Sequence, residues 1–142
     1  MDTLTSTANS MLNLIATAAG STPYMMIYSG TAPSKSGGSY QSATSSGATL
    51  LATLPMSNPI GPAASAGVLT LSAITTETGA YTGTPSFFRI CTTNTDGTGG
   101  ANCIAQGTAG VGSGELNFSS QISAGGNVSV TTGMTITNPA AS

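Results

Sequence analysis

Charged side chains are almost missing from this sequence. The chain has 142 residues, of which two are lysine or arginine and four are aspartate or glutamate, and its net charge is −2. In ordinary globular domains about a quarter of all residues are charged. Nucleic-acid binding needs several basic side chains to neutralise phosphates, and Lys35 and Arg89 cannot supply them. The sequence therefore predicts no nucleic-acid partner, and it predicts a neutral surface that suits close packing in an assembly.

Histidine is absent altogether. Without it, a serine or cysteine nucleophile lacks its usual general base, and a zinc site lacks a common ligand. Glu77 and Asp96 fall in predicted loops and Glu115 begins a predicted strand, so no catalytic carboxylate pair is expected. We expect a protein that is not an enzyme and that binds no metal or cofactor.

Long apolar runs are missing too. None approaches the roughly twenty residues that cross a bilayer, and the first residues, MDTLTSTANSMLNLIATAAG, lack the basic start of a secretory signal. The expectation is a protein with no membrane partner that is used without export. The chain length suits one domain, which can fold without a metal or disulfide framework.

One helix is predicted, in an N-terminal arm of residues 1–20. Asp2 or Thr3 is available as its N-cap and Gly20 as its stop. Apolar residues recur there at spacings of three and four: Leu4, Ala8, Met11, Leu12 and Ile15. Two interpretations are open, a helix that covers one end of the domain or an arm that docks on a partner.

The remaining residues, 21–142, are predicted to form a single all-β domain. Seven segments alternate with period two and are rich in β-branched and aromatic residues, and the last would give an eighth strand if it bends at Gly133. Short strands separated by Gly and Pro turns favour an antiparallel β-sandwich or jelly roll. The segments are 24–29, 49–54, 67–73, 86–92, 102–107, 115–122 and 127–137.

Two hairpins can be placed in register. In ICTTNTDGTGGANCI a three-residue loop from Asp96 to Thr98 sets Cys91 opposite Cys103 and, next to this pair, Ile90 opposite Ile104. Three residues would then face the core, namely Phe88, Ile90 and Ile104, and three would face away from it, namely Phe87, Arg89 and Cys91. The cysteines could form a cross-strand disulfide, or remain thiols in a reducing cytoplasm.

The second hairpin, ISAGGNVSV, is predicted to turn at Gly125 and Gly126. Its apolar residues are predicted to lie in the core, those before the turn on one face and those after it on the partner strand. They are Leu116, Phe118 and Ile122, followed by Val128, Val130, Met134 and Ile136. Outside this hairpin, Arg89 is expected on the outer face of its strand, paired with Glu77 or Glu115.

A long loop, residues 30–48, has neither helical nor strand periodicity, and loops of this length are often functional. It has no aliphatic residue larger than alanine, so we expect it to be ordered by a neighbouring subunit, with Tyr40 as the anchor and Lys35 meeting an acidic patch. The helix, through Met11, Leu12 and Ile15, would contribute to the same contact. The alternative is a solvated excursion.

Several phrases in fixed order point to a family. MIYSGTAP, LLATLPMSNPIGPAASAGVLTLSAIT, TGTPSFFRI, QGTAGVGSGELNF and ISAGGNVSVTTGMTITNP resemble small head proteins of tailed bacteriophages, of the cement or decoration type. The resemblance implies a β-sandwich or jelly-roll protein with a structural role. Its partners would be the major capsid protein and other copies of itself in a dimer or trimer, and it would lie on the capsid exterior after assembly in the host cytoplasm. A phage tail, fibre or spike module that recognises a receptor or sugar is the alternative.

Overall fold

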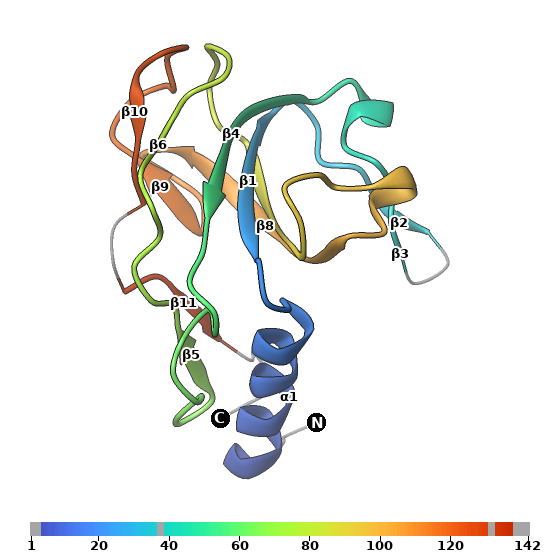
Figure 1. The fold of residues 1–142 in the computed structure, drawn as a ribbon, viewed down its shortest axis with the longest axis vertical. Helices are drawn as coiled ribbons and strands as arrows, with labels where there is room; N and C mark the ends of the chain where they lie inside the picture. Colours follow the sequence, from blue (N-terminus) through green and yellow to red (C-terminus); the bar gives the residue numbers. More distant parts are fainter. Residues whose placement is uncertain (1–3, 37–38, 131–132, 138–142) are drawn as a thin grey trace.

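The computed structural model of the protein describes residues 4–36, 39–130 and 133–137. In these residues the chain forms one α-helix and eleven strands, mostly short, so the β-rich character that the sequence predicts is confirmed. The helix α1 spans Thr5–Ala18 (Figure 1). The strands are β1 (Tyr24–Ser29), β2 (Lys35–Ser36), β3 (Ser39–Tyr40), β4 (Thr49–Pro55), β5 (Val68–Thr70), β6 (Glu77–Thr78), β7 (Phe87–Cys91), β8 (Cys103–Val111), β9 (Leu116–Phe118), β10 (Asn127–Val128) and β11 (Thr135–Thr137).

Five strands form a central sheet in the order β4-β1-β7-β8-β9. All neighbours in it are antiparallel except β8 and β9, which run parallel. The other strands form two-stranded sheets that pair β5 with β11, β6 with β10, and β2 with β3. The prediction of a purely antiparallel arrangement is therefore wrong at β9.

The connection from β8 to β9 explains this parallel pair. Gly112 and Gly114 adopt left-handed backbone angles, with φ of 69° and 86°, which glycine reaches without the steric cost of a Cβ. They let the chain double back so that β9 follows the end of β8 in the same direction. Gly114 lies so close to the backbone of Ala109 that a Cβ would approach its carbonyl carbon to 2.9 Å.

Both faces of the central sheet are buried. One face packs into the main core, to which Met25, Ile27, Phe88 and Ile90 belong together with residues of α1 and the small sheets. The opposite face, which we call the second face, is covered by loops. The buried residues on it form what we call the second cluster. Its members are Met26, Tyr28, Ala43, Ala48, Phe87, Cys91 and Cys103. Phe87, Arg89 and Cys91 do face away from the main core, as predicted, but all three are buried.

The first predicted hairpin is confirmed at the cysteines and wrong next to them. Cys91 pairs with Cys103, but Ile90 pairs with Ala105 because a bulge shifts the register between Ile90 and Cys91. Ile104 is the extra residue, and it packs half-buried against the main core. The connecting loop is also longer than predicted, since residues 92–102 lie between the strands and contain a 3₁₀ turn, Thr98–Gly100.

The second predicted hairpin turns where expected, with the Gly126 N–H donating to the Ser123 carbonyl at 3.0 Å. Its two arms, however, pair with residues 77–83 rather than with each other, since Asn127 pairs with Thr78 and Ile122 with Gly83. The segment that was expected to bend near Gly133 is divided into β10 and β11. The predicted core residues of this region are buried or half-buried, as expected: Leu116, Phe118, Ile122, Val128, Val130, Met134 and Ile136.

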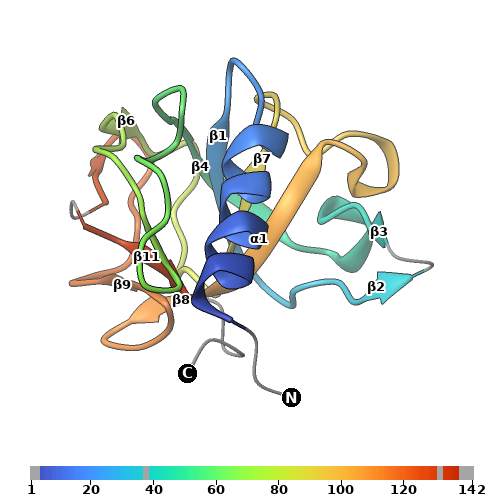
Figure 2. The ribbon, with the colours of Figure 1, turned by 90° about the horizontal axis from the view of Figure 1, so that it is seen from below.

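The helix covers one end of the domain (Figure 2). Leu4 occupies the N-cap position without a side-chain cap, the alternatives Asp2 and Thr3 lie outside the described residues, and Gly20 follows the last turn at φ 76° as predicted. Two asparagine side chains bind the helix to the segment before β5: the Asn9 side-chain amide oxygen accepts the Gly67 N–H and the Asn13 side-chain amide oxygen accepts the Ala64 N–H, each at 2.8 Å. Among the described helices, none is long and apolar enough to cross a membrane.

Candidate functional site

The loop of residues 30–48, between β1 and β4, lies over the second face of the central sheet. Ala43 and Ala48 are buried in the second cluster. Within the loop, β2 and β3 pair with Lys35 opposite Tyr40, and this hairpin projects to one side of the molecule in both ribbon views (Figures 1 and 2). The loop is thus docked on its own domain at Tyr40, Ala43 and Ala48, which the lack of large aliphatic side chains did not suggest.

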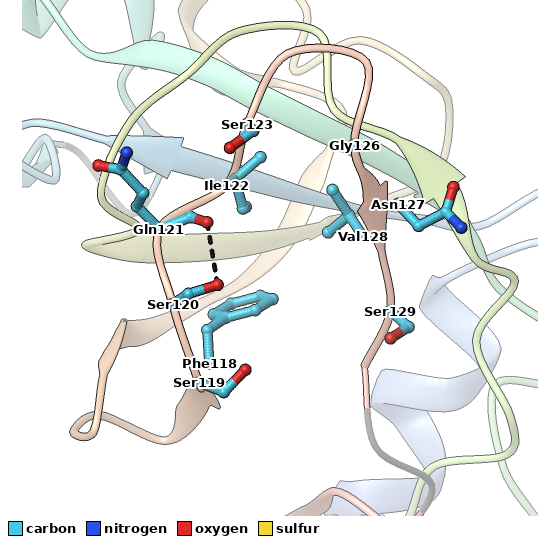
Figure 3. Close-up of a pocket in the computed structure, with 10 residues that line it drawn as sticks. All are labelled: Phe118, Ser119, Ser120, Gln121, Ile122, Ser123, Gly126, Asn127, Val128 and Ser129. Atoms are coloured by element: carbon cyan, nitrogen blue, oxygen red, sulfur yellow. Dashed lines mark hydrogen bonds between the residues drawn. The ribbon is translucent and has the colours of Figure 1, made fainter.

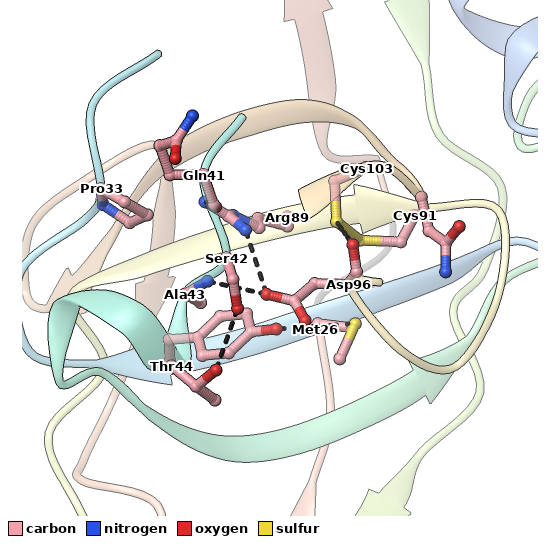
Figure 4. A network of polar contacts seen from close by, with 12 residues as sticks. Met26, Pro33, Gln41, Ser42, Ala43, Thr44, Arg89, Cys91, Asp96 and Cys103 are labelled. Atoms are coloured by element: carbon pink, nitrogen blue, oxygen red, sulfur yellow. Dashed lines mark hydrogen bonds and ion pairs between the residues drawn. A yellow bond between two sulfur atoms is a disulfide. The ribbon is translucent and has the colours of Figure 1, made fainter. Parts of the chain in front are cut away.

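Arg89 binds this loop from the central sheet. Its side chain projects from β7 into the second face and is fully buried. Nε donates to the Gln106 amide oxygen at 3.0 Å and Nη2 to the backbone carbonyl of Gln41 at 2.7 Å. Nη1 donates to Oδ2 of Asp96 at 3.2 Å (Figure 4). The Tyr40 ring lies over the guanidinium, 5.5 Å from its centroid to Cζ. A buried cation is tolerated when it is paired and hydrogen-bonded in this way.

Asp96 connects three segments at one carboxylate oxygen. Besides the Arg89 guanidinium, Oδ2 accepts the backbone N–H of Ala43 at 2.8 Å. The residue itself belongs to the loop of residues 92–102, so this oxygen joins that loop to β7 and to the 30–48 loop. Sequence reasoning missed this role of Asp96.

The predicted partners of Arg89 are therefore wrong. Glu77 is exposed in β6, and Glu115 instead accepts the backbone N–H of Thr108 at 2.8 Å and its hydroxyl at 3.2 Å. The Glu115 carboxylate lies beside Gly107 on the side of the sheet to which Phe88 points. Arg89 points to the other side, because neighbouring residues of a strand face opposite ways.

Next to the ion pair, Cys91 and Cys103 form a disulfide with Cα atoms 4.0 Å apart. Of the two alternatives for the cysteines, the structure contains the bonded one. The bond is enclosed, since Cys91 is 0% and Cys103 9% exposed. Sγ of Cys103 lies 3.8 Å from the Asp96 carbonyl oxygen. The disulfide thus closes the base of the loop that carries Asp96.

Aromatic side chains fill the rest of the second face. The rings of Tyr28 and Phe87 stack with centroids 4.9 Å apart and planes 6° from parallel. Among the described residues, the Tyr28 hydroxyl donates to a soft acceptor, Sδ of Met26 at 3.7 Å. Burial raises the pKa of this hydroxyl well above its ordinary value, the charge of Asp96 acts in the same direction, and the charge of Arg89 opposes both.

The outer side of the loop is exposed and nearly neutral. The Lys35 ammonium lies 4.8 Å from the centroid of the Tyr40 ring, so the structure brings these two predicted interface residues together. Tyr40 is half-buried between Lys35 and Arg89, and it anchors the loop to this chain's own sheet. Hydroxyl and amide groups line a shallow hollow beside them: Thr31, Ser34, Gln41, Ser42, Ser45 and Ser46.

The predicted interface residues of the helix separate into two groups. Leu12 is only 3% exposed and packs in the main core, against which Ile15 also packs. Met11 is 51% exposed, and Leu4 and Leu14 are exposed beside it at 75% and 67%. The two inward residues are thus core residues, because the helix turns them to its own domain, and Met11 is the one that reaches the surface.

A second hollow, of about 220 Å³, lies between β9 and β10. Figure 3 shows the Phe118 ring facing Val128 across it, with serine hydroxyls around the rim and the amides of Gln121 and Asn127 pointing outward on opposite sides. None of the ten residues that line it titrates near neutral pH. The hollow offers hydrogen-bonding and apolar contacts rather than acid–base chemistry.

The described residues contain no group of three or more His, Cys, Asp or Glu side chains that could hold a metal ion. Comparison with family models, with curated proteins and with solved structures finds no match to this chain. The 30–48 loop with its Arg89 and Asp96 anchor is therefore the candidate functional site on geometry alone.

Proposed function

We propose that this protein is a cement or decoration protein of a tailed-phage head, a structural component that binds the outside of the capsid and bridges major capsid protein subunits. It would be assembled in the host cytoplasm and act in the virion together with other copies of itself. The observation that carries the proposal is the 30–48 loop, a long polar segment hydrogen-bonded over the sheet at Gln41 and Ala43, with an almost uncharged outer side. The finer fold proposed with it is a β-sandwich or jelly roll, in which the small sheets serve as the second layer.

The energetics of such a contact favour this reading of the loop. A loop that is already fixed by Asp96 and Arg89 loses little conformational entropy when a partner binds, and this pre-organisation strengthens binding. The net charge of the chain is only −2, so long-range electrostatic repulsion between copies is weak. A lattice that brings many identical copies together is served by both properties.

Removing the loop is a poor test of this proposal, because its absence would expose Tyr28, Phe87 and Arg89 on the second face. A substitution on the outer side is sharper. Ser45→Glu places a charge on the exposed side of the loop, and Thr76→Glu places the same charge beside β6, away from the β2–β3 hairpin. Both variants should keep the parent's thermal stability.

The assay uses heads of the parent particle that lack the protein. We expect Ser45→Glu to lower the number of copies bound per head and the resistance of the heads to heat, and Thr76→Glu to leave both unchanged. Equal loss or equal retention in the two variants would contradict the role of the loop. Finding only a few copies of the protein in each purified particle would contradict the cement function itself.

A tail, fibre or spike module is the second candidate, and the hollow of Figure 3 favours it. A sugar site favours an aromatic ring beside carboxylates or amides, and Phe118 lines this hollow together with Gln121 and Asn127. If this function holds, the protein binds a host-surface glycan and Phe118→Ala weakens the binding, whereas Phe88→Leu in the core does not. Location in the tail of purified particles by antibody labelling would separate it from the first proposal.

A further inference from the structure

The disulfide and the 30–48 loop are connected through the loop of residues 92–102. Cys91 and Cys103 hold the two ends of the 92–102 loop together. Asp96, in its middle, binds the Ala43 N–H at 2.8 Å and the Arg89 guanidinium at 3.2 Å. The position of Asp96 therefore decides whether the hydrogen bond from the Ala43 N–H, which holds the 30–48 loop on the sheet, can form.

A second contact joins the same two loops. Gly100 lies against the backbone of residues 40 and 41, where a Cβ would approach the Tyr40 carbonyl oxygen to 2.6 Å and the Gln41 carbonyl oxygen to 2.8 Å. The 92–102 loop thus touches the 30–48 loop at two places, at Ala43 and at residues 40 and 41, and Arg89 Nη2 also binds the Gln41 carbonyl. Widening the base of the 92–102 loop would disturb both contacts.

The disulfide is shielded from solvent by the 30–48 loop, whose position it helps to fix. Both cysteines belong to the second cluster with Ala43 and Ala48 of the 30–48 loop, and at most 9% of either is exposed. Thiol–disulfide exchange needs access of a second sulfur species to the cysteine. The exchange therefore needs these loops to be lifted, and it becomes slow once they are docked.

We propose that Cys91 and Cys103 form a redox latch for the 30–48 loop: as thiols they leave it free to lift from the sheet, and as a disulfide they lock it down. The locking step is an exchange with a small-molecule disulfide. The protein S–S bond forms as the small-molecule S–S bond breaks, the two cysteines lose two electrons, and both of their protons end on the two small thiols released.

Only the timing of this step rests on the proposed function. In the reducing cytoplasm where a phage head is assembled, thiols persist, whereas the medium outside a lysed cell is oxidising. A cement protein would therefore dock before the disulfide forms, and the disulfide would then fix the loop and strengthen the contact in the released particle. The latch itself is a property of the isolated protein.

Hydrogen exchange of the isolated protein, followed by mass spectrometry, tests the latch. The forms compared are the oxidised protein, the protein reduced with a dithiol, and the Cys91→Ser/Cys103→Ser double variant. We expect amide protection in residues 40–48 to fall at least about tenfold in the two forms without the bond, as for a segment that opens locally. Protection in β1 and β4 should stay unchanged, and oxidised glutathione should restore protection to the reduced protein.

Two variants with the bond intact show whether it acts through Asp96. Asp96→Ala should release residues 40–48 in the oxidised protein, and Glu115→Ala, which removes an acid that binds Thr108 instead, should not. Unchanged protection of residues 40–48 without the bond would overturn the latch, and so would loss of protection throughout β1 and β4, since the bond would then stabilise the whole fold. Retained protection in Asp96→Ala would overturn the route through Asp96. None of these readouts involves a capsid, so failure of the cement function would be seen separately.

Discussion

Arg89 and Asp96 form an ion pair across the second face of the sheet, with Nη1 and Oδ2 3.2 Å apart and the two side chains 0% and 15% exposed. Each partner also binds the backbone of the loop above, Arg89 at the Gln41 carbonyl and Asp96 at the Ala43 N–H. A long loop with little apolar surface of its own is thus held by charged groups. The chain places one of its two basic residues in this buried position.

Replacing the arginine tests how much this pair contributes. Arg89→Met keeps the length and much of the volume of the side chain but leaves Asp96 without its cation. Removing one partner of a buried pair costs about 3–5 kcal/mol of unfolding free energy, and we expect a loss in that range by urea denaturation. Lys35→Met, at the exposed lysine, should change the same free energy by less than about 0.5 kcal/mol.

The double variant Arg89→Met/Asp96→Asn removes both charges. Its loss of unfolding free energy should be smaller than the sum of the two single losses, because neither single charge is then left buried without its partner. Strict additivity would show that the two side chains act independently and would contradict the ion pair as the anchor of the loop.

Two leucines of α1 make a matched pair of a core and a surface residue. Leu12 is 3% and Leu14 67% exposed, and both lie within the helix. Leu12→Ala should lower the free energy of unfolding by about 2–4 kcal/mol, since it leaves a cavity in the main core. Leu14→Ala should change it by less than about 0.5 kcal/mol. Thermal or chemical unfolding measures both, and equal effects would contradict the orientation of the helix.

Local pattern was enough to predict most strands and one register. Alternation placed β1, β4 and β7 within a residue or so, and the symmetric spacing around the 92–102 loop placed Cys91 opposite Cys103. The bulge at Ile104 was not predicted, because one extra residue leaves the kinds of residue in the strand unchanged. The turn at Gly125 and Gly126 was also found, since it depends on neighbouring residues alone.

Pairing between distant segments was not predictable in the same way. The arms on either side of that turn bind residues 77–83, a choice made by the packing of the whole domain. Asp96 was overlooked as the partner of Arg89 for a similar reason. The cysteine register held a signal, since it sets Asp96 within a loop that starts next to Arg89, but the expectation of an exposed outer face led to Glu77 and Glu115 instead.

Two adjacent glycines in the 3₁₀ turn, Gly99 and Gly100, allow the cost of backbone strain to be measured apart from the cost of a close contact. Both have left-handed backbone angles, with φ of 63° and 71°, yet a Cβ on Gly99 meets nothing within 4 Å while one on Gly100 would press on the Tyr40 and Gln41 carbonyls. Gly99→Ala should therefore cost only the strain of the left-handed angle, about 1–2 kcal/mol.

Gly100→Ala should cost more than Gly99→Ala in the same unfolding experiment, and it should also raise hydrogen exchange in residues 40–43. The fixed backbone carbonyls cannot move aside as a flexible side chain could. Similar values for the two variants, with residues 40–43 equally protected, would contradict the close contact between the two loops.

The buried hydroxyl of Tyr28 should make the free energy of unfolding depend on pH in alkaline solution. Burial raises its pKa in the folded protein above the value of about 10 that holds for the unfolded chain. Below pH 10 the hydroxyl is protonated in both states and this group causes no pH dependence. Above pH 10 the unfolded chain loses the proton while the folded protein keeps it, so the free energy of unfolding falls as pH rises towards the folded pKa.

The matched variant is Tyr28→Phe, which keeps the stacked ring beside Phe87 and removes the hydroxyl that contacts Met26 Sδ. At pH 7 its free energy of unfolding should lie within about 1 kcal/mol of the parent's, because only a weak hydrogen bond is lost. Between pH 10 and 11 the parent should lose stability faster than the variant, by up to about 1.4 kcal/mol for each pH unit. The other titrating groups are common to both proteins, so the difference between the two curves isolates this hydroxyl. Parallel curves from urea denaturation at pH 7 to 11 would mean that Tyr28 ionises as readily in the folded protein as in the unfolded chain, and that the 30–48 loop does not keep water from the second face.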